Sequence, residues 1–383
     1  MGGGARLQPA ARTAPPAVEA PLTVTPVAPI APAGPAATSA TGKLQVALLL
    51  PLSGPSAALG QAMLDAAQMA LFEVADDRLQ LLVRDSGGTA ATAAAAAQSA
   101  IADGARLILG PLLAAEVEAT KPVAQSANVA LVAFSTATQL AGNGTWLLGF
   151  DARQEIERVV LFALAHGRNN FAVLAPTSPY GDIAVAALHD AAQTAGATVG
   201  RVARYDPATT DFSTIVQSFA GGGVDFDAVL LPEGGTRLKS LAPLLPYYGV
   251  DPDHAKLLGT GLWADASIIT EPALDGGWYA APPPEVRGDF EKRFQALYKH
   301  SPPLLATLGY DATALAAMLA RAPSGADFSA AALTNPSGFS GLNGIFRLLP
   351  DGLVERGLAV LEVHRTGATV IDPAPQTFQR LGY

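Results

Sequence analysis

The chain has 383 residues, of which 50% are apolar and 15% are charged, and its formal net charge is −9 at pH 7. This length suffices for two α/β lobes with buried cores, and the acidic balance argues against a nucleic-acid partner, which needs a basic surface. The lack of cysteine excludes disulfides, thiolate metal ligands and cysteine nucleophiles. No histidine pair has metal-ligand spacing, so we expect neither metal nor cofactor.

Residues 1–42 differ in composition from the rest of the chain. Proline recurs among alanines through residues 5–41, and because proline lacks an N–H donor and fixes φ, neither a helix nor a central strand can continue there. We expect a disordered, extended tether to a membrane anchor. The opening residues lack the basic and apolar regions of a signal peptide, so an exported protein would have its true start upstream.

Strands and helices alternate regularly from residue 43 onward. Continuous apolar runs predict strands at residues 44–50, 79–83, 106–109 and 129–134. Apolar residues at helical spacing predict intervening helices at 59–74, 89–102 and 114–126. Near-continuous apolar strands that alternate with helices are typical of a parallel sheet covered on both faces.

A second alternation follows a short apolar segment at residues 146–150. Helices are predicted at 154–166, 182–195, 212–220 and 236–245. Strands are predicted at 171–175, 198–205, 228–231 and 256–258. The expected fold class is therefore α/β, with two doubly wound parallel-sheet lobes.

The last part of the chain breaks this rhythm. It predicts a strand at 278–281, helices at 286–299 and 304–319, and a β-hairpin within 345–364 that turns at Asp351-Gly352. The chain is thus expected to revisit both lobes. The expected lobes are 43–150 plus 277–340, and 151–276 plus 341–366, with a tail at 367–383. Hinge crossovers are expected near 149–153, 275–277 and 341–344.

A ligand cleft is expected where the carboxyl ends of the two parallel sheets meet. The loops after the strands carry hydroxyl, acidic and aromatic side chains. The candidate cleft residues are Ser53, Ser135, Thr136, Thr138, Tyr180, Glu233 and Trp263. Each loop taken singly is equally explained by helix capping and turn formation. Several such loops on two facing units favour a cleft.

Catalytic signatures are missing from the sequence. No nucleophile–base pair, paired-carboxylate motif or metal cluster is visible, so we expect a binding protein and no enzyme. Residues 259–264 nearly match a dinucleotide fingerprint, but no acidic residue ends a following strand at the expected distance. Asp151, Glu155 and Glu157 have the spacing of surface ion pairs with neighbouring arginines.

Several short motifs resemble type I periplasmic binding proteins over residues 43–365. The matching segments are Leu50-Pro51-Leu52-Ser53-Gly54-Pro55, Leu109-Gly110-Pro111, Phe134-Ser135-Thr136, Pro179-Tyr180-Gly181, Asp211-Phe212 and Gly309-Tyr310-Asp311. Within that superfamily the opening strand and loop are most similar to penicillin-binding protein activators. Branched-chain amino-acid-binding proteins of ABC importers are the other similar group.

The resemblance implies a type I periplasmic binding protein fold and two alternative functions. The first is activation of a peptidoglycan synthase by a lipoprotein of the outer membrane. The alternative is a solute-binding receptor that delivers amino acids, or a related small polar ligand, to an ABC permease. Both imply a periplasmic location, with membrane attachment only through a lipid anchor upstream, because this chain has no lipidated cysteine.

In the amino-acid binders, the resemblance assigns the ligand carboxylate to loops of the first lobe and the ammonium to the second. Ser135, Thr136, the Ala137 backbone and Thr138 match the carboxylate side, and Tyr180 matches the ammonium side. The serine expected after Gly110-Pro111 and the glutamate expected near residues 261–263 are absent. An ammonium buried without a carboxylate is costly, so only Glu233 remains for it, and weak or no binding of leucine, isoleucine and valine is predicted.

Overall fold

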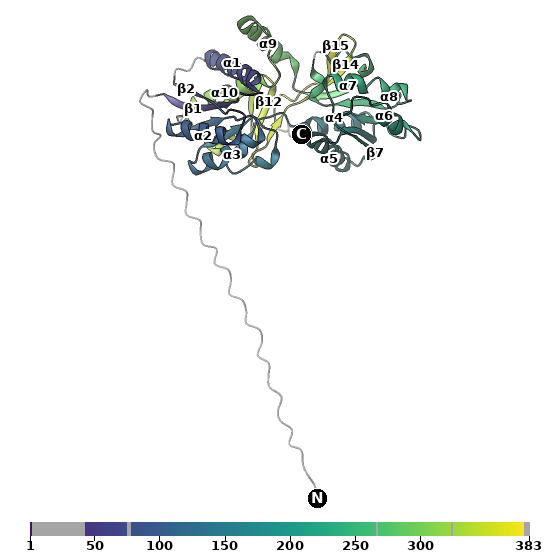
Figure 1. The fold of residues 1–383 in the computed structure, drawn as a ribbon, viewed down its shortest axis with the longest axis horizontal. Helices are drawn as coiled ribbons and strands as arrows, with labels where there is room; N and C mark the ends of the chain where they lie inside the picture. The colour runs from purple at the N-terminus through teal and green to yellow at the C-terminus, as the bar shows by residue number, and fades with distance from the viewer. Residues whose placement is uncertain (2–42, 75–77, 266, 323–324, 379–383) are drawn as a thin grey trace. The chain divides into compact units, whose positions relative to one another are not determined.

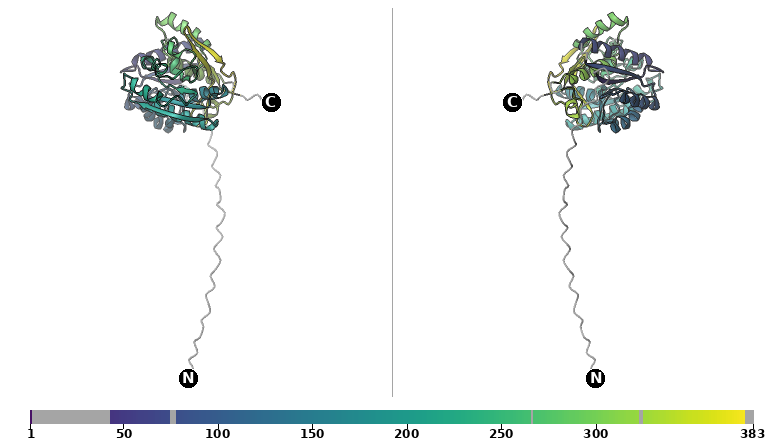
Figure 2. Two further views of the ribbon diagram at one scale, coloured as in Figure 1. Left: turned by 90° about the vertical axis from the view of Figure 1, so that its right-hand side faces the viewer. Right: turned by 90° about the vertical axis from the view of Figure 1, so that its left-hand side faces the viewer.

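The computed structural model describes Met1 and residues 43–74, 78–265, 267–322 and 325–378. The predicted tether, residues 2–42, lies outside the described residues. The described chain forms two α/β lobes, each built around its own sheet with helices on both faces (Figures 1 and 2). The predicted fold class is confirmed.

The first lobe contains a five-stranded parallel sheet of order β2-β1-β3-β4-β5. Its strands are β1 (Leu44–Leu50), β2 (Leu79–Asp85), β3 (Leu107–Leu109), β4 (Ala130–Ala133) and β5 (Thr145–Leu147). Its covering helices are α1 (Ala57–Val74), α2 (Ala90–Ala102), α3 (Ala114–Ser126) and α10 (Ala306–Ala320). Alternate β1 residues face opposite layers: Leu48 packs toward α1 and α10, and Leu49 toward α2 and α3. Burial on both faces explains the continuous apolar run.

The second lobe contains a seven-stranded sheet of order β15-β14-β10-β9-β8-β6-β7. Its strands are β6 (Asn170–Pro176), β7 (Thr198–Tyr205), β8 (Ala228–Leu230), β9 (Lys256–Gly259), β10 (Trp278–Ala281), β14 (Ala359–His364) and β15 (Gly367–Asp372). One face packs against α4 (Ala152–Ala165) and α5 (Pro179–Thr194). The other face packs against α6 (Ser213–Ala220), α7 (Gly235–Leu241) and α8 (Leu244–Tyr247). Strand β14 runs antiparallel to both of its neighbours, β10 and β15, and the other strand pairs of this sheet are parallel.

A third sheet of order β11-β12-β13 packs on the first-lobe core. Its strands are β11 (Phe339–Gly341), β12 (Gly344–Leu348) and β13 (Val354–Arg356). The predicted hairpin is therefore wrong in part. The Asp351-Gly352 turn joins β12 to β13, whereas residues 359–364 form β14 of the other lobe. The remaining α-helices of the described residues are α9 (Pro284–Tyr298) and the short α11 (Ala330–Leu333).

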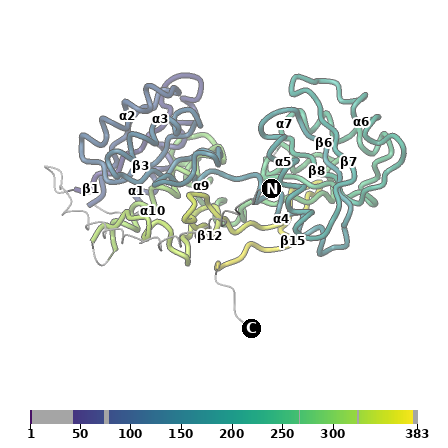
Figure 3. Tube along the Cα trace, turned by 90° about the horizontal axis from the view of Figure 1, so that it is seen from below, coloured from purple at the N-terminus to yellow at the C-terminus, as the bar shows by residue number. Residues whose placement is uncertain are grey.

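The chain crosses between the lobes at residues 148–151, 282–283 and 357–358, and Figure 3 follows its trace through these crossings. The first of these crossings overlaps residues 149–153. The other two lie later than predicted, because β10 hydrogen-bonds to β9 in the second sheet and β13 stays with the first lobe. Helices α9 and α10 return to the first lobe, where Phe290 and Phe294 bury against α1.

Local sequence accounts for several helix starts. Thr89 accepts a hydrogen bond from the Thr92 amide at α2, and Asp151 accepts one from the Arg153 amide at α4. Such side chains satisfy N–H groups that have no partner within the helix. Gly309 lets α10 approach the backbone of α1 closely, since a Cβ on Gly309 would lie 2.3 Å from the Met63 oxygen. None of the described helices is long and apolar enough to cross a membrane.

Candidate functional site

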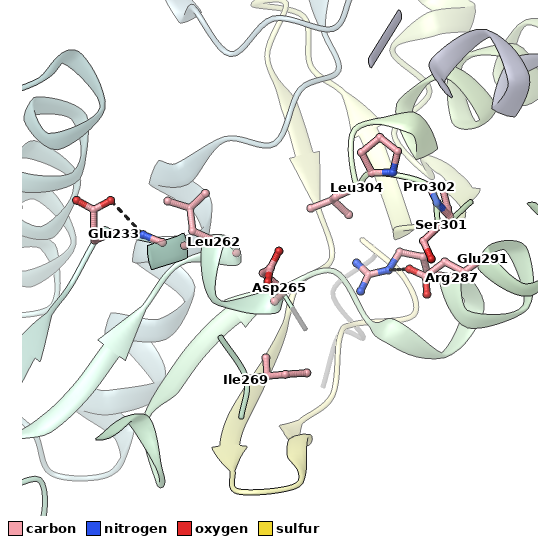
Figure 4. A pocket seen from close by; sticks show the side chains of 14 residues that line it. Glu233, Leu262, Asp265, Ile269, Arg287, Glu291, Ser301, Pro302 and Leu304 are labelled. Atoms are coloured by element: carbon pink, nitrogen blue, oxygen red, sulfur yellow. Dashed lines mark hydrogen bonds and ion pairs between the residues drawn. The ribbon is translucent and has the colours of Figure 1, made fainter. Parts of the chain in front are cut away.

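A pocket of about 840 Å³ is lined by both lobes. Its second-lobe wall comes from the loops after β8 and β9, and its first-lobe wall comes from α9 and the segment that follows it (Figure 4). The lining residues are Glu233, Gly234, Gly235, Gly261, Leu262, Ala264, Asp265, Ile269, Arg287, Glu291, Ser301, Pro302, Pro303 and Leu304. The wall therefore mixes acidic, basic and apolar groups, which suits a small polar ligand.

Beside this pocket, α4, α5 and the loop after β9 bring a carboxylate and two hydroxyls together. The Gly261 amide donates to Glu155 Oε2 at 2.9 Å, and the Tyr180 hydroxyl lies 2.9 Å from Thr260 Oγ1. Glu155 is only 7% exposed. Burial raises the pKa of Glu155 to about 7, against the opposing effects of the Gly261 amide and Arg356. Burial also raises the pKa of Tyr180.

Glu233 lines the pocket but is already paired within the second lobe. Its Oε2 accepts hydrogen bonds from the Tyr205 hydroxyl at 2.7 Å and from Arg237 Nε at 3.0 Å. The Arg237 guanidinium in turn lies 5.3 Å from the ring centre of Phe212. Glu233 thus reaches the pocket as one half of an ion pair.

None of the predicted first-lobe residues lines the 840 Å³ pocket. The Ser53 amide donates to Asp85 Oδ1 at 3.3 Å, and Ser135 Oγ accepts from the Ala137 amide at 3.2 Å. Thr138 Oγ1 accepts from Arg153 of α4 at 3.0 Å, so this contact joins the two lobes. Ser135 is buried, whereas the adjacent Thr136 is exposed.

A profile described as a periplasmic binding protein matches residues 43–368. The chain belongs to the periplasmic binding protein family. Its α/β fold, with parallel-strand sheets and helices, matches that of type I members. No curated protein sequence matched the chain.

Solved structures of periplasmic binding proteins share this fold at low sequence identity. A putative branched-chain amino acid ABC transporter protein from Rhodospirillum rubrum has a TM-score of 0.76 and 20% identity, over 86% of this chain and 100% of that one. A Streptococcus pneumoniae branched-chain amino acid transporter substrate-binding protein in complex with isoleucine has a TM-score of 0.63 and 16% identity, over 86% of this chain and 100% of that one. A Rhodopseudomonas palustris solute-binding protein in complex with 3,4-dihydroxybenzoic acid has a TM-score of 0.63 and 16% identity, over 87% of this chain and 99% of that one.

The prediction that Trp263 offers its ring to the cleft of this periplasmic binding protein is wrong. The indole is 0% exposed and belongs to the second-lobe core. Residues 261–264 form a 3₁₀ turn that directs the ring beneath the backbone of Gly259, where a Cβ would lie 2.1 Å from the indole. The neighbouring Leu262 faces the pocket instead.

Sequence reasoning missed both the pocket wall on α9 and the buried acid on α4. Glu155 is predicted as a surface ion-pair residue, but it packs under Gly261, whose Cβ position would lie 2.6 Å from Glu155 Oε1. The only sequence signal for a buried Glu155 is its position in the first turn of α4, the helix that follows a crossover between the lobes. Arg287 and Ser301 carry no motif that sets them apart.

Arg356 is a buried cation between the lobes of this periplasmic binding protein. Its Nη2 donates to the Leu148 carbonyl, and its guanidinium lies 4.8 Å from the ring centre of Phe150. Burial lowers the pKa of Arg356 to about 10, although the charges of Asp311 and Glu155 oppose that change. Arg356 therefore stays cationic at neutral pH between one carboxyl from each lobe.

Metal binding has no support in the described residues. Across residues 43–378, apart from the undescribed gaps, no group of three His, Asp or Glu side chains stands close enough to hold an ion.

Proposed function

We propose that this protein is the extracytoplasmic solute receptor of an ABC importer, with an amino acid or a related small polar molecule as its ligand. One observation carries the proposal: the pocket is lined by loops at the carboxyl ends of β8 and β9 from one lobe and by α9 from the other. A ligand that contacts both walls favours the conformation in which the two lobes hold it between them.

The matched solved structures support the same function. They are ABC transporter and solute-binding proteins, and two of them are in complex with isoleucine or 3,4-dihydroxybenzoic acid. The permease partner and a binding role without catalysis are part of this proposal. The comparisons give no support for activation of a peptidoglycan synthase. Family membership supports an extracytoplasmic location, and anchoring to the outer membrane stays a prediction.

A screen for ligands tests the proposal. The full chain should show a raised melting temperature with at least one solute from a panel of amino acids and hydroxybenzoates. A ligand present at 100 times its Kd stabilises a protein by about 2.7 kcal/mol, which shifts the melting temperature of a body of this size by several degrees. Mass spectrometry of small molecules released on denaturation provides an independent readout.

A pair of tryptophan variants links the signal to the pocket. Leu262→Trp should abolish the shift, because Leu262 lines the pocket and is 45% exposed there. Leu161→Trp is the control, since Leu161 is 43% exposed on α4 outside the pocket. If no solute stabilises the wild type and none is released from it, the receptor function is wrong.

A further inference from the structure

We infer that Glu155, and not Glu233, is the acidic group of the cleft that receives a cationic group of the ligand, such as a primary ammonium. This inference rests on the proposed receptor function and deepens it, because it assigns the ligand class. The loop after β9 carries no carboxylate of its own at Gly261-Leu262-Trp263.

The geometry puts a carboxylate at that same loop from a different element. Glu155 lies in the first turn of α4, and its Oε2 accepts the Gly261 amide at 2.9 Å. Its Oε1 accepts no hydrogen bond from any residue that the structure describes. Gly261 itself lines the pocket. Glu155 therefore places a largely buried carboxylate, with Oε1 free of hydrogen bonds from the described residues, behind the Gly261 backbone that lines the pocket, and a ligand cation there would stabilise its charged form.

Glycine at position 261 is part of this arrangement. A Cβ there would lie 2.6 Å from Glu155 Oε1, so any larger side chain would cover the free oxygen. Beside it, the Tyr180 hydroxyl and Thr260 Oγ1 lie 2.9 Å apart. One of these hydroxyls donates to the other, and the remaining lone pairs can accept hydrogen bonds from an ammonium group.

The other acids of the pocket are less suited to this task. Glu233 is paired with Arg237 and Tyr205, and Glu291 accepts from Arg287 Nε at 2.9 Å. Asp265 lies near solvent and accepts the Ser267 amide at 2.8 Å. Water and salt weaken the attraction of an exposed carboxylate for a cation far more than that of a buried one.

Ligand binding at pH 7 should therefore release about half a proton from Glu155. The charged groups that act on Glu155 are Asp151 on its own helix and Arg356 from β13, and Tyr180 of α5 lies beside it. With a pKa of about 7, the free protein carries roughly half a proton on Glu155 at neutral pH. A bound ammonium favours the ionised form, so that proton leaves, and the apparent Kd should rise about tenfold per pH unit well below the pKa.

The experiment uses the full chain and the standard L-amino acids as probes, each compared with the matching acid that lacks the amino group. Thermal shift selects the tightest amino acid, and titration calorimetry in two buffers of different ionisation enthalpy measures the proton release. Glu155→Gln should weaken binding by roughly 30-fold or more and abolish the proton release. Glu155→Asp should retain part of both. Glu157→Gln, an exposed carboxylate two residues along α4, is the matched control and should change neither.

The outcomes separate this inference from the proposed function. Binding of an amino acid with the loss confined to Glu155→Gln supports both. Unchanged affinity in Glu155→Gln, or loss in Glu233→Gln alone, overturns the inference and leaves the receptor function standing. If only acids without an amino group bind, with 3,4-dihydroxybenzoate as one probe, the inference is also overturned and the receptor function stands. If no probe binds the wild type, the inference is overturned together with the amino-acid receptor.

Discussion

At the scale of single residues, burial decides what each charged group can do. Glu155 and Glu233 are both glutamates near one pocket, yet one is 7% exposed with a single amide partner and the other is paired with Arg237. The two carboxylates therefore differ in their availability to a ligand.

This difference predicts a pH effect on the stability of the ligand-free protein. The pKa of Glu155 is raised from 4.5 to about 7, so the folded state binds more protons than the unfolded state within that range. Protonation of Glu155 therefore stabilises the folded state fully below pH 4.5, and this stabilisation is lost as the pH rises through about 7. At about pH 8, Glu155→Gln should stabilise the free protein by on the order of 3 kcal/mol.

Urea unfolding of wild type and Glu155→Gln across this pH range provides the measurement. The two curves should meet near pH 4.5 and separate on the alkaline side. The same pH dependence in both proteins would show that Glu155 is not the titrating group.

At the scale of secondary-structure elements, the contact between α1 and α10 holds the first lobe together on one sheet face. Gly309 sits against the backbone of α1, where a Cβ would lie 2.3 Å from the Met63 oxygen. Gly309→Ala must push the helices apart, and we expect a loss of about 2 kcal/mol in the free energy of unfolding.

Gly288 on α9 supplies the matched control for this substitution. A Cβ there meets nothing within 4 Å, so Gly288→Ala should raise stability by up to about 1 kcal/mol through helix propensity alone. Denaturant unfolding of both variants measures the contrast. Equal effects of the two substitutions would contradict close packing at Gly309.

At the scale of the whole molecule, a receptor with two walls around its ligand should change the separation of its lobes on binding. The chain has no cysteine, so introduced cysteines can be labelled selectively. Exposed Leu297 on α9 and exposed Tyr247 on α8 lie in different lobes. Energy transfer between dyes at Leu297→Cys and Tyr247→Cys should increase when a ligand is added.

A second dye pair confined to one lobe separates lobe movement from dye artefacts. Leu297→Cys with Met318→Cys places both dyes at exposed positions of the first lobe. This pair should show constant transfer efficiency. A ligand that raises the melting temperature without changing transfer in the first pair would show that binding does not move the lobes.

The sequence by itself determined the two α/β lobes and most of their strands, because apolar periodicity and capping residues act over short distances along the chain. It also determined the Asp351-Gly352 turn, whose geometry is local. Only the tertiary structure decided which strand pairs with β12, that Trp263 lies in the core and that Glu155 lies under Gly261. These features depend on contacts between residues far apart in the sequence, and burial of a side chain is set by what packs over it.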